Sequence, residues 1–162
     1  HPVASTKLQG SVVKLRQAHM FCCSQAVERI CGDGFLLAGD AAGFVSPVAV
    51  EGIWYAMKTG EAAGRSAVTA LAENQGPSRL TEIYSRNIAP RVTEDMRYGL
   101  GIRRRFLDRE DQQEKIFAAA RQDKWFQDLV AEALNGSISH KQWMAKLYRH
   151  PEKLIKAKLL YR

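Results

Sequence analysis

The chain has 162 residues, of which 46% are hydrophobic and 25% are charged. This composition is typical of one folded domain, or of a domain with an appendage, and it excludes collagen-like repeats, coiled coils and intrinsic disorder. The formal charge is +7, from 24 basic and 17 acidic residues, and no apolar run approaches the roughly 18 residues that cross a bilayer.

The first third of the chain predicts a few short strands. The opening string HPVASTKLQG has neither Met nor a long apolar segment, so we expect an internal part of a longer polypeptide. Residues 11–23 alternate weakly in hydropathy, which indicates one or two strands, and a turn at 32–34 leads to a buried strand at 35–38. Two strands cannot bury both faces of a sheet, so we expect most of the sheet to lie outside this chain.

The three cysteines, Cys22, Cys23 and Cys31, all lie in this region. An odd count favours reduced thiols in the cytoplasm. Together with His19 they could be imagined as a zinc site, but their spacing fits no usual ligand pairing, and adjacent cysteines on a strand point to opposite faces. We therefore expect buried thiols and no metal.

The remainder of the chain has helical spacing. Residues 51–73 predict a helix whose small and apolar residues form one closely packed face: Ile53, Ala56, Met57, Gly60, Ala63, Gly64, Ala67, Val68 and Leu71. A stop at 74–77 follows, with Ser78 as the predicted cap of a long helix at 79–108 that Pro90 kinks or splits. Further helices are predicted at 112–120, 125–134, 140–149 and 151–160, with Pro151 opening the last.

Most of the net positive charge, +6 of +7, lies in residues 137–162. This segment has seven basic residues and one acidic residue, which leaves 17 basic and 16 acidic residues in the first 136 residues. Basicity is thus confined to one tail, and we expect no nucleic-acid partner. The tail also carries aromatic and aliphatic residues, and we expect its helices to pack on the domain, with docking on an anionic lipid surface as the alternative.

Residues 32–67 carry the pattern that points to chemistry. A predicted strand leads to Asp40, glycines stand at 39 and 43, and a helix begins near Gly52. Ligands of open α/β sheets collect at the carboxyl ends of strands, where helix N-termini offer free N–H groups and a partial positive charge. Asp40 could accept hydrogen bonds from a hydroxyl there, and glycines let a ligand approach the backbone. The alternative is a tight turn without a ligand.

The string LLAGDAAGFVSPVAVEGIWYAMKTGEAA resembles the second flavin-binding motif of FAD-dependent oxidoreductases of the geranylgeranyl reductase type, which belong to the aromatic hydroxylase-like flavoproteins. The matching positions are Gly39, Asp40, Ala41, Ala42, Gly43, Pro47, Glu51, Gly52, Ile53, Ala56 and Gly60. The resemblance implies an α/β or α+β fold, the C-terminal fragment of an FAD/NAD(P)-binding Rossmann-like flavoprotein with few strands followed by a mainly helical region. It implies the end of the FAD-binding domain at 1–74 and a helical subdomain at 75–162.

The same resemblance implies which residues contact FAD: Gly39, Asp40, Ala41, Ala42, Gly43, Pro47, Gly52 and Ile53. Asp40 would bind the ribityl hydroxyls, the backbone of Ala41 would contact the pyrophosphate, and Pro47 would lie near the isoalloxazine ring. The N–H groups of Gly52 and Ile53 would face the flavin edge where negative charge develops on reduction. No side chain is expected to act as a general acid or base.

Two departures from the family pattern bear on function. Val48-Ala49-Val50 stands where the family usually has a polar pair, which leaves the substrate class open. The GxGxxG fingerprint that holds the ADP half of FAD is absent, since Gly99-Leu100-Gly101 lacks the third glycine. We therefore expect an N-terminal nucleotide-binding half on the same precursor or on another chain, and we expect this chain alone to be inactive.

The function implied by the resemblance is hydride transfer through FAD to an isoprenoid or related hydrophobic substrate, in a cytoplasmic or peripheral membrane enzyme. The competing hypothesis is a non-catalytic helical interaction or membrane-docking module derived from such an enzyme. Trp54 and Tyr55 would begin the helix next to the flavin, and packing and pocket lining are both open to them. His140 and His150 have no evident partner and are expected at the surface.

Overall fold

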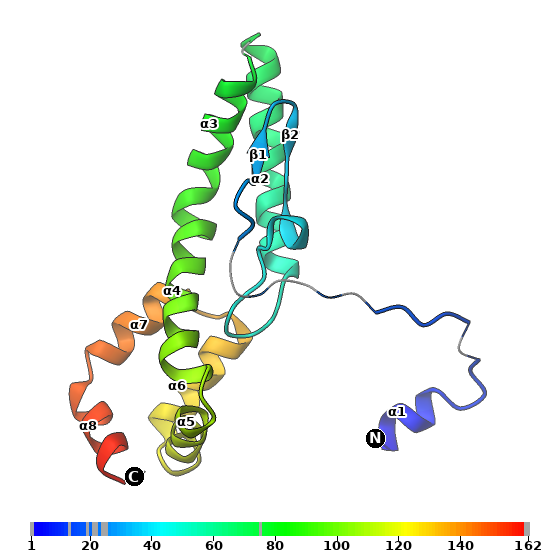
Figure 1. The fold of residues 1–162 in the computed structure, drawn as a ribbon. Helices are drawn as coiled ribbons and strands as arrows, with labels where there is room; N and C mark the ends of the chain where they lie inside the picture. The colour runs from blue at the N-terminus through cyan, green and yellow to red at the C-terminus, as the bar shows by residue number, and fades with distance from the viewer. Residues whose placement is uncertain are drawn as a thin grey trace.

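The computed structural model describes residues 2–12, 14–18, 20, 23, 26–74 and 76–160, the last five of these as backbone only. It is 68% helical, with one small antiparallel sheet. The α-helices are α1 (Pro2–Lys7), α2 (Ile53–Ala72), α3 (Pro77–Ile88), α4 (Glu94–Ile102), α5 (Glu110–Gln122), α6 (Lys124–Asn135), α7 (His140–Tyr148) and α8 (Pro151–Leu160). In Figure 1, α1 lies apart from the other helices, and it has no buried residue.

The sheet is a two-residue hairpin. Strands β1 (Cys31–Gly32) and β2 (Phe35–Leu36) pair antiparallel, with Cys31 opposite Leu36. Gly34 in the connecting turn has φ +77°, which glycine adopts without strain. The predicted turn is therefore present, but the strand predicted at 35–38 is shorter, and Phe35 is 40% exposed.

The described residues between 11 and 23 contain no strand and, except for the half-buried Cys23, are exposed. A strand needs a neighbour to accept its backbone hydrogen bonds, and the part of the chain that the structure describes provides none beyond the β1–β2 hairpin. A mainly helical α+β architecture agrees with the prediction at this coarse level.

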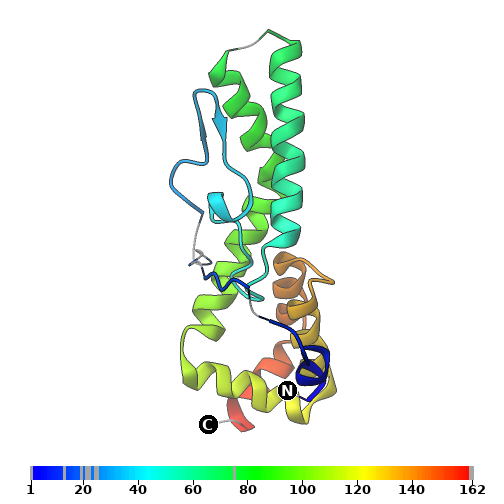
Figure 2. The ribbon, with the colours of Figure 1, turned by 90° about the vertical axis from the view of Figure 1, so that its right-hand side faces the viewer.

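Helix α2 begins and ends within two residues of its predicted bounds, but the predicted packed face is wrong. The buried positions are Tyr55, Thr59, Ser66 and Ala70, whereas Met57 and Leu71 of the predicted face are 69% and 81% exposed. The buried positions recur at helical spacing: Ser66 accepts from Asn87 of α3, Thr59 from the Gly39 N–H, and Tyr55 donates to Asp95 of α4. Helix α3 runs antiparallel beside α2 in Figures 1 and 2. Polar Thr59 and Ser66 are tolerated there because each hydroxyl donates to a carbonyl of the preceding turn, at 2.7 Å in both cases.

Helices α3 and α4 form one long rod that is interrupted where Pro90 was predicted to interrupt it. The π-helical segment η2 (Ala89–Thr93) joins them, and a second π segment, η3 (Arg103–Leu107), follows α4. Proline lacks an N–H and displaces the carbonyl one turn back, and a wider turn accommodates both effects. The start of α3 also differs from prediction, since Gly76 is its N-cap and Pro77 its first residue.

The apolar core consists of two clusters. The first lies between α2, the α3–α4 rod and the residues after β2, and contains Ala42, Phe44, Tyr55, Tyr84, Ile88, Val92 and Met96. The second lies among the helices at the other end of the rod, and contains Ile102, Ala119, Phe126, Leu129, Ala133, Trp143 and Leu147. The predicted domain boundary at 74/75 falls at the turn between α2 and α3, and it stays a prediction.

Candidate functional site

The predicted glycine-rich segment forms a turn that packs on the start of α2. Residues Gly39–Ala42 are a single turn of 3₁₀ helix, η1, closed by Gly43 in the left-handed conformation. The Gly39 N–H donates to the buried Thr59 Oγ1 at 2.9 Å. Gly39 has φ +56°, and a Cβ atom there would lie 2.8 Å from the Cβ of Ala56. Only glycine allows this approach of the turn to the helix.

Asp40 lies beside the N-terminus of α2. A Cβ atom on Gly52, the N-cap residue, would lie 2.7 Å from Asp40 Oδ1. The partial positive charge of a helix N-terminus favours a carboxylate there. Asp40 is exposed, and no hydrogen bond to its carboxylate comes from any described residue. Glu51 caps the same helix end, where its Oε1 accepts from the Trp54 N–H at 2.9 Å.

The other predicted contact residues differ in accessibility. Ala41 and Ile53 are exposed, Ile53 to 73%. Ala42 and Gly43 are buried, and Ala42 belongs to the first core cluster. Their packing explains the small side chains without a ligand, so the turn presents Asp40, Ala41 and the first turn of α2 to solvent.

Pro47 is the one predicted contact residue that faces the α7 side. It is buried, and its Cδ would lie 3.1 Å from a Cβ atom on Gly99 of α4, where the His140 ring also approaches. The structure therefore brings Gly39, Asp40 and Gly52 together, whereas Pro47 packs against α4 near His140.

Comparison of the chain with protein-family models, with curated protein sequences and with solved structures found no match. No helix among the described residues has the length and apolar character needed to span a membrane. In the same residues no group of three or more His, Cys, Asp or Glu side chains is placed to hold a metal ion. Of the imagined zinc ligands, His19 and Cys22 lie outside the described residues, while Cys23 and Cys31 are half-buried free thiols.

The exposed groups of this segment fit one part of FAD. An accessible carboxylate suits the ribityl hydroxyls, and a helix N-terminus suits the electron-rich edge of a flavin or a phosphate. The fit extends to these groups alone, because the surface around Asp40 is open. A cavity of about 750 Å³ lies nearby and is lined by Glu51, Trp54 and Tyr55.

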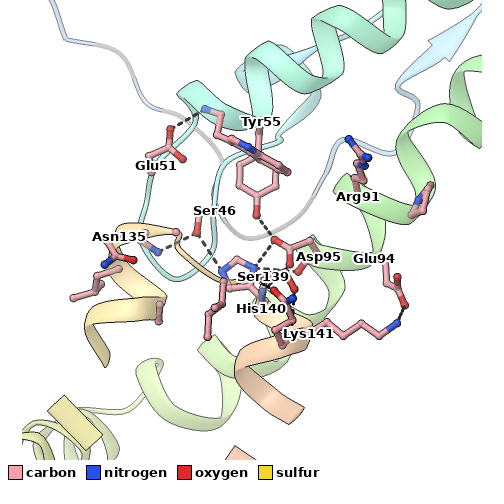
Figure 3. Close-up of a pocket in the computed structure, with 18 residues that line it drawn as sticks. Ser46, Glu51, Tyr55, Arg91, Glu94, Asp95, Asn135, Ser139, His140 and Lys141 are labelled. Carbon is pink, nitrogen blue, oxygen red and sulfur yellow. Dashed lines mark hydrogen bonds and ion pairs between the residues drawn. The ribbon is translucent and has the colours of Figure 1, made fainter. Parts of the chain in front are cut away.

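That cavity contains a hydrogen-bonded cluster that the sequence did not indicate. Tyr55 donates its hydroxyl to Asp95 Oδ2 at 2.6 Å. The backbone N–H of His140 donates to Asp95 Oδ1 at 2.7 Å, and the His140 ring Nδ1 lies 2.9 Å from Asp95 Oδ2. Ser46 Oγ lies 3.5 Å from His140 Nε2. Figure 3 shows the four side chains pointing toward one another from four separate segments.

Burial and hydrogen bonding set the charges in this cluster. Burial alone would raise the pKa of Asp95, but the hydrogen bonds from His140 and Tyr55 outweigh it and hold the pKa of that carboxyl below its ordinary value. Burial, followed by the hydrogen bond to Asp95, raises the pKa of Tyr55 far above its ordinary range. Asp95 is therefore the anion of the cluster and Tyr55 a neutral donor.

The prediction that His140 lies at the surface is wrong, because its side chain is only 7% exposed. Asp95 was not singled out at all, and pocket lining by Tyr55 was one of two open interpretations. No local pattern could have found the cluster, since its members are separated by 9 to 94 positions in the sequence. His150 is half-buried, and its Nδ1 lies 3.1 Å from Glu152 Oε1.

The apolar residues of the tail are largely used for packing. Trp143 and Leu147 are buried in the second core cluster, and Leu154 packs against it. Lys146 and Lys153 pair with Glu132 and with Asp123, each at 2.7 Å. Packing on the domain was the first of the two interpretations of this tail, and contact with lipid stays a prediction.

Proposed function

We propose that this chain is part of an FAD-dependent oxidoreductase and that residues 39–53 hold part of the cofactor. The observation that carries the proposal is the exposed Asp40 carboxylate, which lies beside the N-terminus of α2. The turn that positions it requires glycine at 39 by both its φ angle and its contact with Ala56. We name FAD as the cofactor because the whole string resembles a flavin-binding motif.

Each exposed group has a role in this proposal. Asp40 accepts hydrogen bonds from ribityl hydroxyls, and the backbone N–H groups of Ala41, Gly52 and Ile53 donate to the cofactor's phosphate or to its electron-rich edge. When bound, the cofactor supplies hydride transfer to a carbon–carbon double bond of an isoprenoid or related hydrophobic substrate. The chain's own contribution is to orient the cofactor and to neutralise its charge.

The uncovered face of α2 supports the view that further chain is needed. Ile53, Met57, Val68 and Leu71 lie along this face and are 67–81% exposed. Large apolar side chains in such a row usually mark a surface that a partner covers. We assign this face to the nucleotide-binding half that the resemblance requires, on the same precursor or on a separate chain.

Titration of the full 162-residue chain with FAD, followed by the change in flavin fluorescence, tests the proposal. We expect weak but saturable binding, because this chain contacts only part of the cofactor. Asp40→Ala should weaken the binding at least tenfold, since a charge-assisted hydrogen bond contributes about 1.5–3 kcal/mol.

The control is Asp33→Ala, which removes another exposed carboxylate, in the β1–β2 turn, and should leave the affinity unchanged. Circular dichroism confirms that each variant is folded. Absence of saturable binding, or equal affinity of the Asp40→Ala variant and the unmodified chain, would overturn the proposal.

A further inference from the structure

Ser46, His140 and Asp95 have the arrangement of a nucleophile, a base and a carboxylate that orients the base. Ser46 Oγ lies 3.5 Å from His140 Nε2, and His140 Nδ1 lies 2.9 Å from Asp95 Oδ2. The three residues come from the loop after η1, from α7 and from α4, and all three line the 750 Å³ cavity. Such a constellation is recognised by geometry and roles rather than by position in the sequence.

The carboxylate fixes the orientation of the imidazole. Asp95 accepts from Tyr55, from the His140 backbone and from the His140 ring. With the proton on Nδ1 directed at this anion, the lone pair of Nε2 faces Ser46. This tautomer is the one that a base needs in order to remove the Ser46 proton.

Backbone N–H groups also form hydrogen bonds with the serine oxygen. The N–H groups of Ala49 and Val48 donate to Ser46 Oγ at 3.1 and 3.4 Å. Both contacts stabilise negative charge that develops on Oγ as the proton leaves.

We propose that Ser46, His140 and Asp95 form a second site, independent of flavin, at which Ser46 attacks carboxylic esters. Ser46 Oγ bonds to the ester carbonyl carbon while its proton passes to His140 Nε2. The bond to the alcohol oxygen then breaks, and His140 returns the proton to that oxygen. Water then attacks the acyl carbon as its proton passes to His140 Nε2, the bond between the acyl carbon and Ser46 Oγ breaks, and His140 returns the proton to Ser46 Oγ as the carboxylic acid leaves.

The cavity walls indicate the kind of ester. Apolar lining comes from Trp54, Leu134 and Ile138, while Glu51 and Arg91 also line the cavity and Lys141 is paired with Glu94 at 3.0 Å. An uncharged ester with an aliphatic acyl group suits the apolar part of these walls, because the ester brings no charge of its own out of water.

The site is tested without flavin by treating the full chain with an alkyl fluorophosphonate and locating the adduct by mass spectrometry. We expect the label on Ser46, formed as fluoride leaves, and hydrolysis of p-nitrophenyl butyrate by the unlabelled chain. His140→Gln should slow both reactions at least a hundredfold, since a positioned general base contributes about 10²–10⁴ in rate. Ser46→Ala should abolish both, and Ser137→Ala, an exposed serine near the cavity, should change neither.

Asp95 acts by positioning the His140 ring, so its role needs a separate measurement. The His140 Nδ1 proton should give a downfield proton NMR resonance that Asp95→Asn removes while the circular dichroism spectrum is unchanged. Failure to label Ser46 in the folded, unmodified chain would overturn the proposal, as would equal labelling of the His140→Gln variant. Loss of FAD binding would leave this result unaffected, because none of these three residues is assigned to the cofactor.

Discussion

Gly39 and Gly34 have similar positive φ angles but very different surroundings. A Cβ atom on Gly39 would lie 2.8 Å from Ala56 Cβ, whereas nothing lies within 4 Å of the corresponding atom on Gly34. Gly34→Ala should therefore cost only the left-handed conformation, about 1 kcal/mol. Gly39→Ala should cost about 1–3 kcal/mol more, because the turn must move away from α2. Urea unfolding of both variants measures the difference, and equal losses would contradict the observed packing.

The half-buried, hydrogen-bonded carboxylate of Asp95 should make stability depend on pH. Its pKa in the folded chain lies below its ordinary value, which is about 3.9 in an unfolded chain. Its contribution is therefore fully present above about pH 4 and is lost as the pH falls through the lower, folded value. At pH 7, Asp95→Asn should lower the free energy of unfolding by about 1.5–3 kcal/mol through weakened hydrogen bonds.

The Asp95→Asn variant also tests the direction of this pH dependence. The stability difference between the unmodified chain and Asp95→Asn should shrink as the pH is lowered from 5 to 2, because protonation removes the charge that the variant lacks. Exposed carboxylates such as Glu61 and Asp111 are present in both proteins and cancel in the comparison. A difference that stays constant with pH would contradict the role given to the Asp95 charge.

At the scale of the element, α2 shows which of its faces the chain itself covers. Ala70 is 5% exposed and its neighbour Leu71 is 81% exposed. Aspartate at either position carries the same cost of low helix propensity near a helix C-terminus. Ala70→Asp should nevertheless destabilise the chain by about 2 kcal/mol or more beyond Leu71→Asp, because it buries a charge. Thermal unfolding of the two variants tests this prediction. A larger loss of stability from Leu71→Asp than from Ala70→Asp would contradict the assignment of the buried and exposed faces of α2.

The bounds of most helices after residue 50 were predictable, because capping residues, prolines and apolar spacing are local signals, whereas α1 was not predicted and α3 begins at Pro77 rather than after Ser78. Pro90 marked the break in the α3–α4 rod, and Pro151 opens α8 as predicted. The buried face of α2 was not predictable. Its apolar stripe runs through Met57 and Leu71, and hydropathy alone does not tell a face covered within the chain from one left open. The observed face instead uses Thr59 and Ser66, whose hydroxyls bond within the helix.

At the scale of the whole molecule, the sequence indicated the candidate cofactor segment but gave no sign of the cavity. Gly39, Asp40 and Gly52 lie within 14 positions of one another, and the predicted strand, glycine-bearing turn and helix placed them in one segment, whose role in cofactor binding stays a prediction. The cavity requires the loop after η1, α2, α4 and α7 to meet, which only the packing of the two core clusters determines. His140 illustrates this, since a single histidine after a serine gives no sign of a carboxylate 45 positions earlier.

The Asp95 cluster also has a consequence for the order of folding. Its hydrogen bonds join residues that are 40, 45 and 94 positions apart, whereas the α2–α3 and α5–α6 pairs are neighbours in the chain. Closing long loops costs entropy that local contacts do not. The two helical hairpins should therefore form first and the Asp95 cluster last. Variants of Asp95 should then speed unfolding while leaving the refolding rate nearly unchanged. The cluster would thus slow unfolding of the native state without helping the chain to reach it.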